Sequence, residues 1–287
     1  MTTLIIILLI LSLVIFYCNK KSNFTPDINK YKSIKDIIML CPVQDEERFI
    51  QLWNKNYEII KQWKIDIIFV HFDLKVDNWK KQFYYYNEDN VKHVITDGCK
   101  SKHWKYLSPL YTNKYKYIWL IDGDMNLKDW NWDIYRSYLK PDDYVSQPAI
   151  IQNDPSHNMF YKKLKYIPGK KITKTNLIEQ QACLIKRDLW NAMYNKVLYS
   201  NNYTSWEIEW YWNEIANKLK NGFEIKNGKK LKDLNNIDNG ELLVVHESPV
   251  IHENFKTIQI GDNKCKRKLI TSEDTEIVDN IINRLKK

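Results

Sequence analysis

Two aspartates that stand one residue apart are the residues of this sequence best suited to chemistry. Asp122 and Asp124 flank Gly123, directly after the apolar and aromatic run at residues 117–121. Gly123 lets the backbone turn sharply, so both carboxylates can converge on one hard divalent cation, and oxygen ligands suit Mg²⁺ or Mn²⁺. A metal held there can in turn bind a diphosphate. The alternative is an ordinary Asp-Gly turn after a strand, which three residues alone do not exclude.

The segments around this pair alternate between strand and helix patterns. Four apolar segments are predicted as strands: residues 36–43, 64–73, 90–97 and 115–122. Apolar residues recur at helical spacing between them, at residues 45–63 and 102–113. This alternation predicts an α/β domain with a mostly parallel central sheet and helices on both faces. Ligands of such sheets bind beyond the carboxyl ends of the strands, where Asp122 and Asp124 stand.

The second half of the sequence continues the pattern less regularly. It predicts a strand followed by a helix in residues 179–197, a helix in residues 206–220, and a late strand with its loop in residues 240–254. A final amphipathic helix begins at Ser272, which is a suitable cap. No repeat or low-complexity linker interrupts the body, so residues 33–287 are expected to form one catalytic domain.

The N-terminal segment carries a membrane signal. Residues 3–18 hold no charge and are almost entirely aliphatic, which predicts a transmembrane signal-anchor over residues 1–18 and a polar stem over residues 19–32. A cleaved signal peptide is the weaker alternative, because no Lys or Arg precedes the apolar run and no small-x-small site follows it. The expectation is a single-pass membrane protein.

The orientation of this anchor is ambiguous. Lys20 and Lys21 follow the segment, which favours a cytoplasmic body. The sequons at Asn23 and Asn202 favour a lumen instead. We expect the catalytic domain in the lumen of the endoplasmic reticulum or Golgi, with the cytoplasmic side as the alternative.

Composition excludes some classes of function. A chain of 287 residues with 44% hydrophobic content can bury a sizeable core, so a disordered protein is excluded. The formal charge of +9 is spread among 35 acidic residues without a basic block or an RNA-binding signature, so no nucleic-acid partner is expected. Five cysteines show no C-x-x-C pair and no metal spacing, and they settle neither compartment nor disulfides.

In this context the D-x-D at the end of an apolar strand resembles the nucleotide-sugar-dependent glycosyltransferases of the GT-A fold. Further segments are similar to the plant family usually labelled "lysine-ketoglutarate reductase trans-splicing related". These segments are VHFDLKVDNW, SKHWKYLSPLYTNKYKYIWLIDGDM, VSQPAI, LIEQQACLIKRDLW, SWEIEW and VVHESPVIH. Their shared order and spacing over most of the body carry the resemblance, because no single motif is decisive.

The resemblance implies a metal site and a nucleotide site. Mn²⁺ or Mg²⁺ would be held by Asp122 and, more directly, Asp124, with His252 as a further ligand and His246 as its substitute. The donor, a UDP-sugar by default, would lie against a second set of residues: Cys41, Pro42, Val43, Asp73, Lys102, Asp122 and Gly123. Within this set Asp73 would contact the base or ribose, or only cap a strand end, and Lys102 would neutralise the diphosphate. Three large aromatic residues are expected in the core rather than at a sugar: Trp104, Trp190 and Trp210.

The resemblance also implies the chemistry. We expect transfer of a sugar to a hydroxyl acceptor on a glycan, glycoprotein or glycolipid, with inversion at the anomeric carbon. Glu209 aligns with the acid of the family's acceptor loop and would be the general base, with Glu207 as the near alternative. Both could instead be solvated acids at a helix start. Ser205 and Glu207 stand where the family has glycine, so the identity of the acceptor cannot be carried over.

Three other functions compete with this interpretation. A metal-dependent nucleotidyltransferase would share the sheet and metal, but no Gly-rich triphosphate loop follows the first strand. An aspartyl phosphatase needs its D-x-D near the start of the domain, followed by Thr or Val, and this chain has neither feature. A non-catalytic binding protein of the same fold remains a third alternative.

Overall fold

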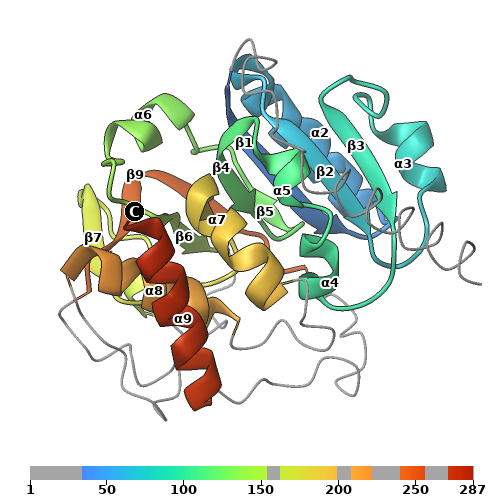
Figure 1. The fold of residues 1–287 in the computed structure, drawn as a ribbon. Coiled ribbons are helices and arrows are strands. Elements are labelled where there is room, and N and C mark those ends of the chain that lie inside the picture. The colour runs from blue at the N-terminus through green and yellow to red at the C-terminus, as the bar shows by residue number, and fades with distance from the viewer. Residues whose placement is uncertain (1–33, 154–161, 199–207, 222–239, 256–270, 287) are drawn as a thin grey trace, which may run out of the picture. The chain divides into compact units, whose positions relative to one another are not determined.

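The computed structural model describes residues 34–153, 162–198, 208–221, 240–255 and 271–286 (Figure 1). The predicted anchor (residues 1–18) and stem (residues 19–32) lie outside these residues. No helix in the described part of the chain is both long and apolar enough to cross a membrane.

Four parallel strands form the first half of the sheet. Their order is β3 (Val91–Ile95), β2 (Asp66–His71), β1 (Lys35–Val43) and β4 (Tyr115–Leu120). β2 is buried along its whole length and β1 along most of it, as their continuous apolar sequences predict for strands covered on both faces. All four strands were predicted from the sequence, and they are confirmed within two residues at each end.

The second half of the sheet is mixed, which corrects the prediction of a mostly parallel sheet. Antiparallel β8 (Leu184–Lys186) joins β4 to β6 (Val145–Gln152), and β6 runs parallel to β9 (Leu242–His252). Two further strands pair antiparallel with β9: β5 (Met125–Asn126) and β7 (Ile172–Thr175). Residues 176–183, which lead from β7 into β8, form a loop.

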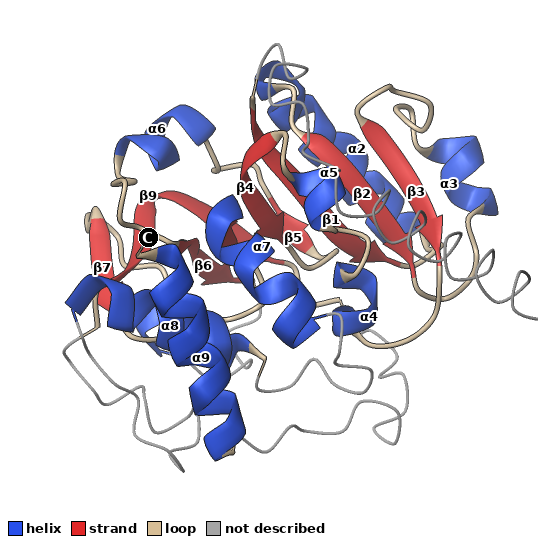
Figure 2. Ribbon diagram, viewed as in Figure 1, coloured by secondary structure: helices blue, strands red, loops and turns tan. Residues whose placement is uncertain are grey.

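Helices cover both faces of this sheet (Figure 2). One face packs against α2 (Glu47–Ile60), α3 (Asp77–Gln82) and α6 (Trp132–Ser137). The other face packs against α4 (Lys100–Trp104), α5 (Pro109–Thr112), α7 (Arg187–Met193), α8 (Glu209–Asn221) and α9 (Ser272–Leu285). Alternate residues of β1 divide between these two cores, with Met39 on the α2 side and Leu40 on the α7 side. The three tryptophans predicted for the core are each at most 3% exposed.

Two local predictions need correction. The helix expected over residues 102–113 is instead split into α4 and α5, because Pro109 favours the first turn of a helix and disrupts a helix interior. The cap of α9 is Thr271, not Ser272. Thr271 and Asp274 form a capping box, in which each side chain accepts a hydrogen bond from the backbone N–H of the other, that of Thr271 reaching Oδ2 of Asp274 at 2.8 Å.

Candidate functional site

The carboxyl ends of β1, β2 and β4 lie at one edge of the sheet. The register pairs Val43 with His71, and Leu40 with Leu120. Beyond β4 the chain stays attached to its neighbours, since the backbone N–H of Asp122 donates to the carbonyl of Gln181 at 2.8 Å. Asp122 is therefore held at the edge where ligands of open α/β sheets bind, as predicted.

Gly123 packs directly against the end of β1. A Cβ atom at this position would lie 2.3 Å from the carbonyl oxygen of Pro42 and 3.0 Å from the ring of Phe49. The carbonyl of Gly123 accepts a hydrogen bond from the buried Trp53 indole at 2.8 Å. Glycine is thus required for close approach, and the indole fixes the backbone between the two aspartates.

The last strand brings His252 to Asp124. Met125 of β5 pairs with His252 of β9, so the residue before Met125 lies beside the imidazole. Nε2 of His252 is 3.1 Å from Oδ2 of Asp124, and the backbone N–H of Phe255 donates to the same oxygen at 3.1 Å. Burial lowers the pKa of His252, but the Asp124 carboxylate offsets this and leaves the pKa raised above its usual value. The contact with Asp124 thus favours the protonated form of His252.

Lys100 forms a salt bridge with Asp122, the first aspartate of the pair. Its Nζ atom lies 2.5 Å from Oδ1 of Asp122, and the two side chains are 30% and 21% exposed. Burial raises the pKa of Asp122, and the opposing charge of Lys100 limits this rise. Burial also lowers the pKa of Lys100, but the attraction of Asp122 reverses the shift, so that the pKa is raised. The lysine and the aspartate therefore stabilise each other's charge.

Glu179 is a further acid at this site, and the sequence interpretation did not assign it a role. Burial raises its pKa to about 7, and the charges of Lys100, Asp122 and His252 also act on it. The only sequence signal is the polar run EQQ at residues 179–181, which directly precedes the buried residues of β8. Glu179 thus brings a third carboxylate to the edge of the sheet.

The side chains of Asp122, Asp124 and His252 are suitable ligands for a hard divalent cation, although each of them already has another partner in this structure. Two carboxylates and one imidazole are ligands that Mn²⁺ and Mg²⁺ accept. In the described residues no three His, Cys, Asp or Glu side chains converge as a ready metal cluster. Asp122 pairs with Lys100 instead, and Asp124 pairs with His252. A cation at this site would have to replace Lys100 at Asp122 and the proton of His252.

The residues predicted to border the nucleotide have mainly structural contacts. Cys41 and Val43 are fully buried, and burial, with the nearby charges of Asp122 and Asp124, raises the pKa of the Cys41 thiol. Asp73 accepts hydrogen bonds from the backbone N–H groups of Asp45 at 2.8 Å and Lys75 at 3.2 Å. Asp73 therefore ties the loop after β1 to the loop after β2, which is the capping role considered as its alternative.

Lys102 and His246, which the sequence suggested for this site, do not contact Asp122 or Asp124 and have other partners. Lys102 pairs with Asp97 at 2.5 Å, with about half of each side chain exposed, so Lys100 is the lysine of the α4 segment that reaches Asp122. Nδ1 of His246 accepts from the backbone N–H of Ile167, and Nε2 contacts the hydroxyl of Thr173. Because both ring nitrogens are engaged there, the structure places His246 away from the aspartates and leaves His252 as the histidine of the site.

The predicted general base is buried. Glu209 is the first residue of α8 and is 4% exposed, and its carboxylate contributes to the raised pKa of the buried Cys183 thiol. Glu209 is not among the groups whose charges act most strongly on Asp122 or His252. Its alternative, Glu207, lies outside the described residues.

No family model matches the chain, and no curated protein matches it. Solved structures do match. TarS from S. aureus in complex with UDP-GlcNAc aligns with a TM-score of 0.51 at 11% identity, over 86% of this chain and 65% of that chain. The chain has the fold of the GT-A glycosyltransferases. At this identity the likeness concerns the fold alone, and this chain spans less than two thirds of TarS.

Two other solved structures match more distantly. A mannosyltransferase, PcManGT from Pyrobaculum calidifontis in complex with GDP-Man and Mn²⁺, has a TM-score of 0.36 at 11% identity, over 63% of this chain and 53% of that one. A 4-diphosphocytidyl-2C-methyl-D-erythritol synthase from Anaerococcus prevotii has a TM-score of 0.41 at 10% identity, over 88% of this chain and 97% of that one. At these scores neither structure bears on function. The resemblance to the plant family rests on the motifs only.

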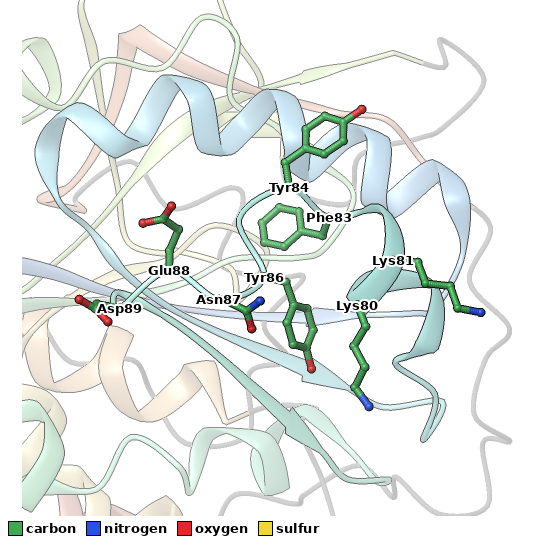
Figure 3. Close-up of a pocket in the computed structure, with 8 residues that line it drawn as sticks. All are labelled: Lys80, Lys81, Phe83, Tyr84, Tyr86, Asn87, Glu88 and Asp89. Carbon is green, nitrogen blue, oxygen red and sulfur yellow. The ribbon is translucent and has the colours of Figure 1, made fainter.

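A surface pocket of about 470 Å³ lies elsewhere in the GT-A-like domain (Figure 3). It is lined by the end of α3 and the loop before β3, including Lys80, Tyr84, Tyr86 and Asp89. Because this loop precedes β3, the pocket lies at the amino ends of the parallel strands, away from Asp122. This pocket is therefore not part of the candidate site at Asp122 and Asp124.

Proposed function

We propose that this protein is a metal-dependent glycosyltransferase that transfers a sugar from a nucleotide sugar, with a UDP-sugar as the first choice, to a hydroxyl group of a glycan or glycoconjugate. The observation that carries the proposal is the contact of His252 with Asp124 at the carboxyl edge of a GT-A-like sheet, where Asp122 stands two residues before Asp124. A site that combines two acidic side chains and an imidazole suits a cation that binds a diphosphate.

In this proposal Asp122, Asp124 and His252 would hold Mn²⁺ or Mg²⁺ when the donor is bound. The cation would neutralise the diphosphate of the donor and stabilise its negative charge as it departs. Lys100 takes the role that the sequence gave to Lys102. With Asp122 as a metal ligand, the ammonium of Lys100 would be available to pair with a phosphate oxygen.

The proposed chemical step inverts the anomeric carbon. The acceptor oxygen forms a bond to this carbon from the face opposite the nucleotide, while the bond from the carbon to the diphosphate oxygen breaks. The acceptor proton passes to a carboxylate, for which Glu209 remains our candidate and Glu207 its alternative.

Release of nucleoside diphosphate from UDP-sugars tests this function. We expect slow hydrolysis of a UDP-sugar that requires Mn²⁺ or Mg²⁺. Glu209→Gln should lower turnover by roughly 100-fold or more while donor affinity changes little, and Glu58→Gln on the exposed face of α2 serves as its control. Release of pyrophosphate from a nucleoside triphosphate would instead indicate a nucleotidyltransferase. Donor binding with no turnover on any acceptor would indicate a non-catalytic protein.

We also propose that residues 3–18 attach the protein to a membrane, with the catalytic domain in the secretory lumen. The apolar sequence supports the anchor. Cys99 is disulfide-bonded, which supports an oxidising compartment. Resistance to carbonate extraction and protection of the domain from protease in sealed microsomes are the expected results. Digestion of the domain in sealed microsomes would place it on the cytoplasmic side.

A further inference from the structure

Gln152 of β6 lies beside His252, the histidine of the candidate site. The two residues are opposite each other in the register of β6 with β9, so their side chains leave the sheet on the same face. Oε1 of Gln152 lies 3.1 Å from Nδ1 of His252. The other ring nitrogen, Nε2, is 3.1 Å from Oδ2 of Asp124. Each nitrogen of this imidazole therefore has its own partner.

The amide oxygen of Gln152 decides which nitrogen of His252 can bind a cation. An amide oxygen accepts hydrogen bonds and cannot donate them, so Nδ1 carries a hydrogen in this contact. A metal ion binds a ring nitrogen that has no hydrogen. While Nδ1 keeps its hydrogen, Nε2 is the nitrogen left for a cation, and Nε2 is the one that faces Asp124. A partner on the second nitrogen is what orients most metal-binding histidines.

The backbone around this contact is held by Glu253. Its carboxylate accepts hydrogen bonds from the side-chain amides of Asn126 at 2.6 Å and Asn153 at 2.7 Å. Its backbone N–H donates to the carbonyl of Asp124 at 2.9 Å, and the N–H of Asn153 donates to the carbonyl of His252 at 3.1 Å. These bonds join β5, β6 and β9 without the side chain of Gln152. A substitution of Gln152 should therefore leave the backbone of the site in place.

The side chain of Gln152 contributes little else to the fold. Its Nε2 atom is buried and has no hydrogen-bond partner within the described ranges. A buried donor without a partner lowers stability, so removal of the whole amide should have a small net cost. Variants of Gln152 can thus test the contact with His252 with little disturbance of the rest of the protein.

We propose that Gln152 is a positioning residue, whose amide oxygen keeps a hydrogen on Nδ1 of His252 and so presents Nε2 to the cation beside Asp124. The cation would replace the hydrogen on Nε2, which leaves as a proton to solvent, while the hydrogen on Nδ1 stays in its bond to Gln152. This inference rests on the proposed function, because it concerns the same metal site. Gln152 acts through His252 and is not itself a ligand.

Equilibrium dialysis with UDP tests this role through the Mn²⁺ concentration that gives half-maximal UDP binding, a measurement that needs no turnover. Gln152→Met keeps the length of the side chain and removes the acceptor, so it should raise this concentration by roughly tenfold or more. Saturating Mn²⁺ should then restore UDP binding. Gln152→Glu keeps an acceptor for Nδ1, so its value should stay at or below that of wild type. Gln51→Met, on the exposed side of α2, is the matched control and should behave as wild type.

A double-mutant cycle separates positioning from a purely structural effect. His252→Gln removes the imidazole that Gln152 holds and should itself raise the required Mn²⁺ concentration. If Gln152 acts through His252, the addition of Gln152→Met to His252→Gln should change this concentration by less than about twofold. A purely structural effect of Gln152→Met would persist in full in the double variant and would overturn the positioning role.

The remaining outcomes distinguish this inference from the proposed function. Mn²⁺-dependent UDP binding that is identical in wild type and Gln152→Met would refute the positioning role and leave the glycosyltransferase proposal standing. A Mn²⁺ requirement raised as much in Gln152→Glu as in Gln152→Met would also refute it, because the acceptor would then be irrelevant. If wild type shows no Mn²⁺-dependent binding of UDP, the proposed function fails, and this inference fails with it.

Discussion

Nε2 of His252, near the end of the last strand, lies 3.1 Å from the carboxylate of Asp124, which follows the central strand β4. The contact depends on the short pairing of β5 with β9, in which Met125 is opposite His252. The antiparallel part of the sheet therefore completes a site that the parallel part begins.

Gly123→Ala should strongly destabilise the protein. The added Cβ would lie 2.3 Å from the Pro42 carbonyl oxygen, and backbone atoms cannot yield as a flexible side chain can. We expect a loss of about 3 kcal/mol in the free energy of unfolding, measured by urea denaturation. Gly169→Ala is the control: it has a positive φ of 75° but open space around it, so it should cost about 1 kcal/mol. Equal costs would contradict the close approach.

Lys100→Gln and Lys102→Gln should differ in their effect on stability. Both lysines have a carboxylate at 2.5 Å, but the Lys100–Asp122 pair is the more buried. Loss of Lys100 leaves a partly buried carboxylate without its counter-charge, at a cost of about 1–3 kcal/mol at pH 8. Loss of the exposed Lys102 should cost less than about 1 kcal/mol. Urea unfolding at pH 8 measures both, and a larger cost for Lys102 would reverse our assignment.

The sequence predicted the parallel half of the sheet because β1 and β2 contain continuous apolar runs and β4 ends in one, a strong signal for buried strands. It missed the mixed half for a physical reason. β8 and β5 have three and two residues, too few for any periodicity, and their direction depends on long-range pairing. Asp122 and Asp124 were placed correctly at the end of a strand because local sequence decides that position.

The lysine of the site could not be chosen from the sequence. Lys100 and Lys102 stand two residues apart on one short helix, so their side chains point in different directions. Only the packing of α4 decides which of them faces Asp122. Glu179 was missed for a related reason, since an acid in a loop becomes significant only when folding buries it beside Lys100 and His252.

Acid should destabilise the domain through a buried pair of histidines. Nε2 of His71 lies 2.8 Å from Nδ1 of His93, and burial lowers the pKa of His71 to about 4 and that of His93 to about 3. Both pKa values in the folded protein lie below the unfolded value of about 6.5. The protein therefore keeps its full free energy of unfolding above pH 6.5 and loses part of it as the pH falls towards 4, because protons bind the unfolded histidines first. Each histidine should then lower the free energy of unfolding by about 2 kcal/mol between pH 7 and pH 5, so the pair contributes a fall of about 4 kcal/mol.

The variant His93→Gln isolates this effect. It removes one titrating group and keeps a hydrogen-bonding partner for His71, so its loss of stability between pH 7 and pH 5 should be smaller than that of wild type. The comparison cancels the contribution of Glu179, whose raised pKa acts in the opposite direction over this range. An identical loss in the two proteins would show that the pair does not titrate as we describe.

The most direct test of the central claim is the affinity of the protein for UDP with and without Mn²⁺, in wild type and in Asp124→Asn. The substitution keeps the volume of the side chain and an acceptor oxygen for the N–H of Phe255, so the fold should persist. Asp77→Asn, an exposed acid of α3, is the control. We predict Mn²⁺-dependent binding in wild type and Asp77→Asn, and its loss in Asp124→Asn. Binding of UDP by Asp124→Asn with the Mn²⁺ dependence of wild type would contradict the metal site and the function built on it.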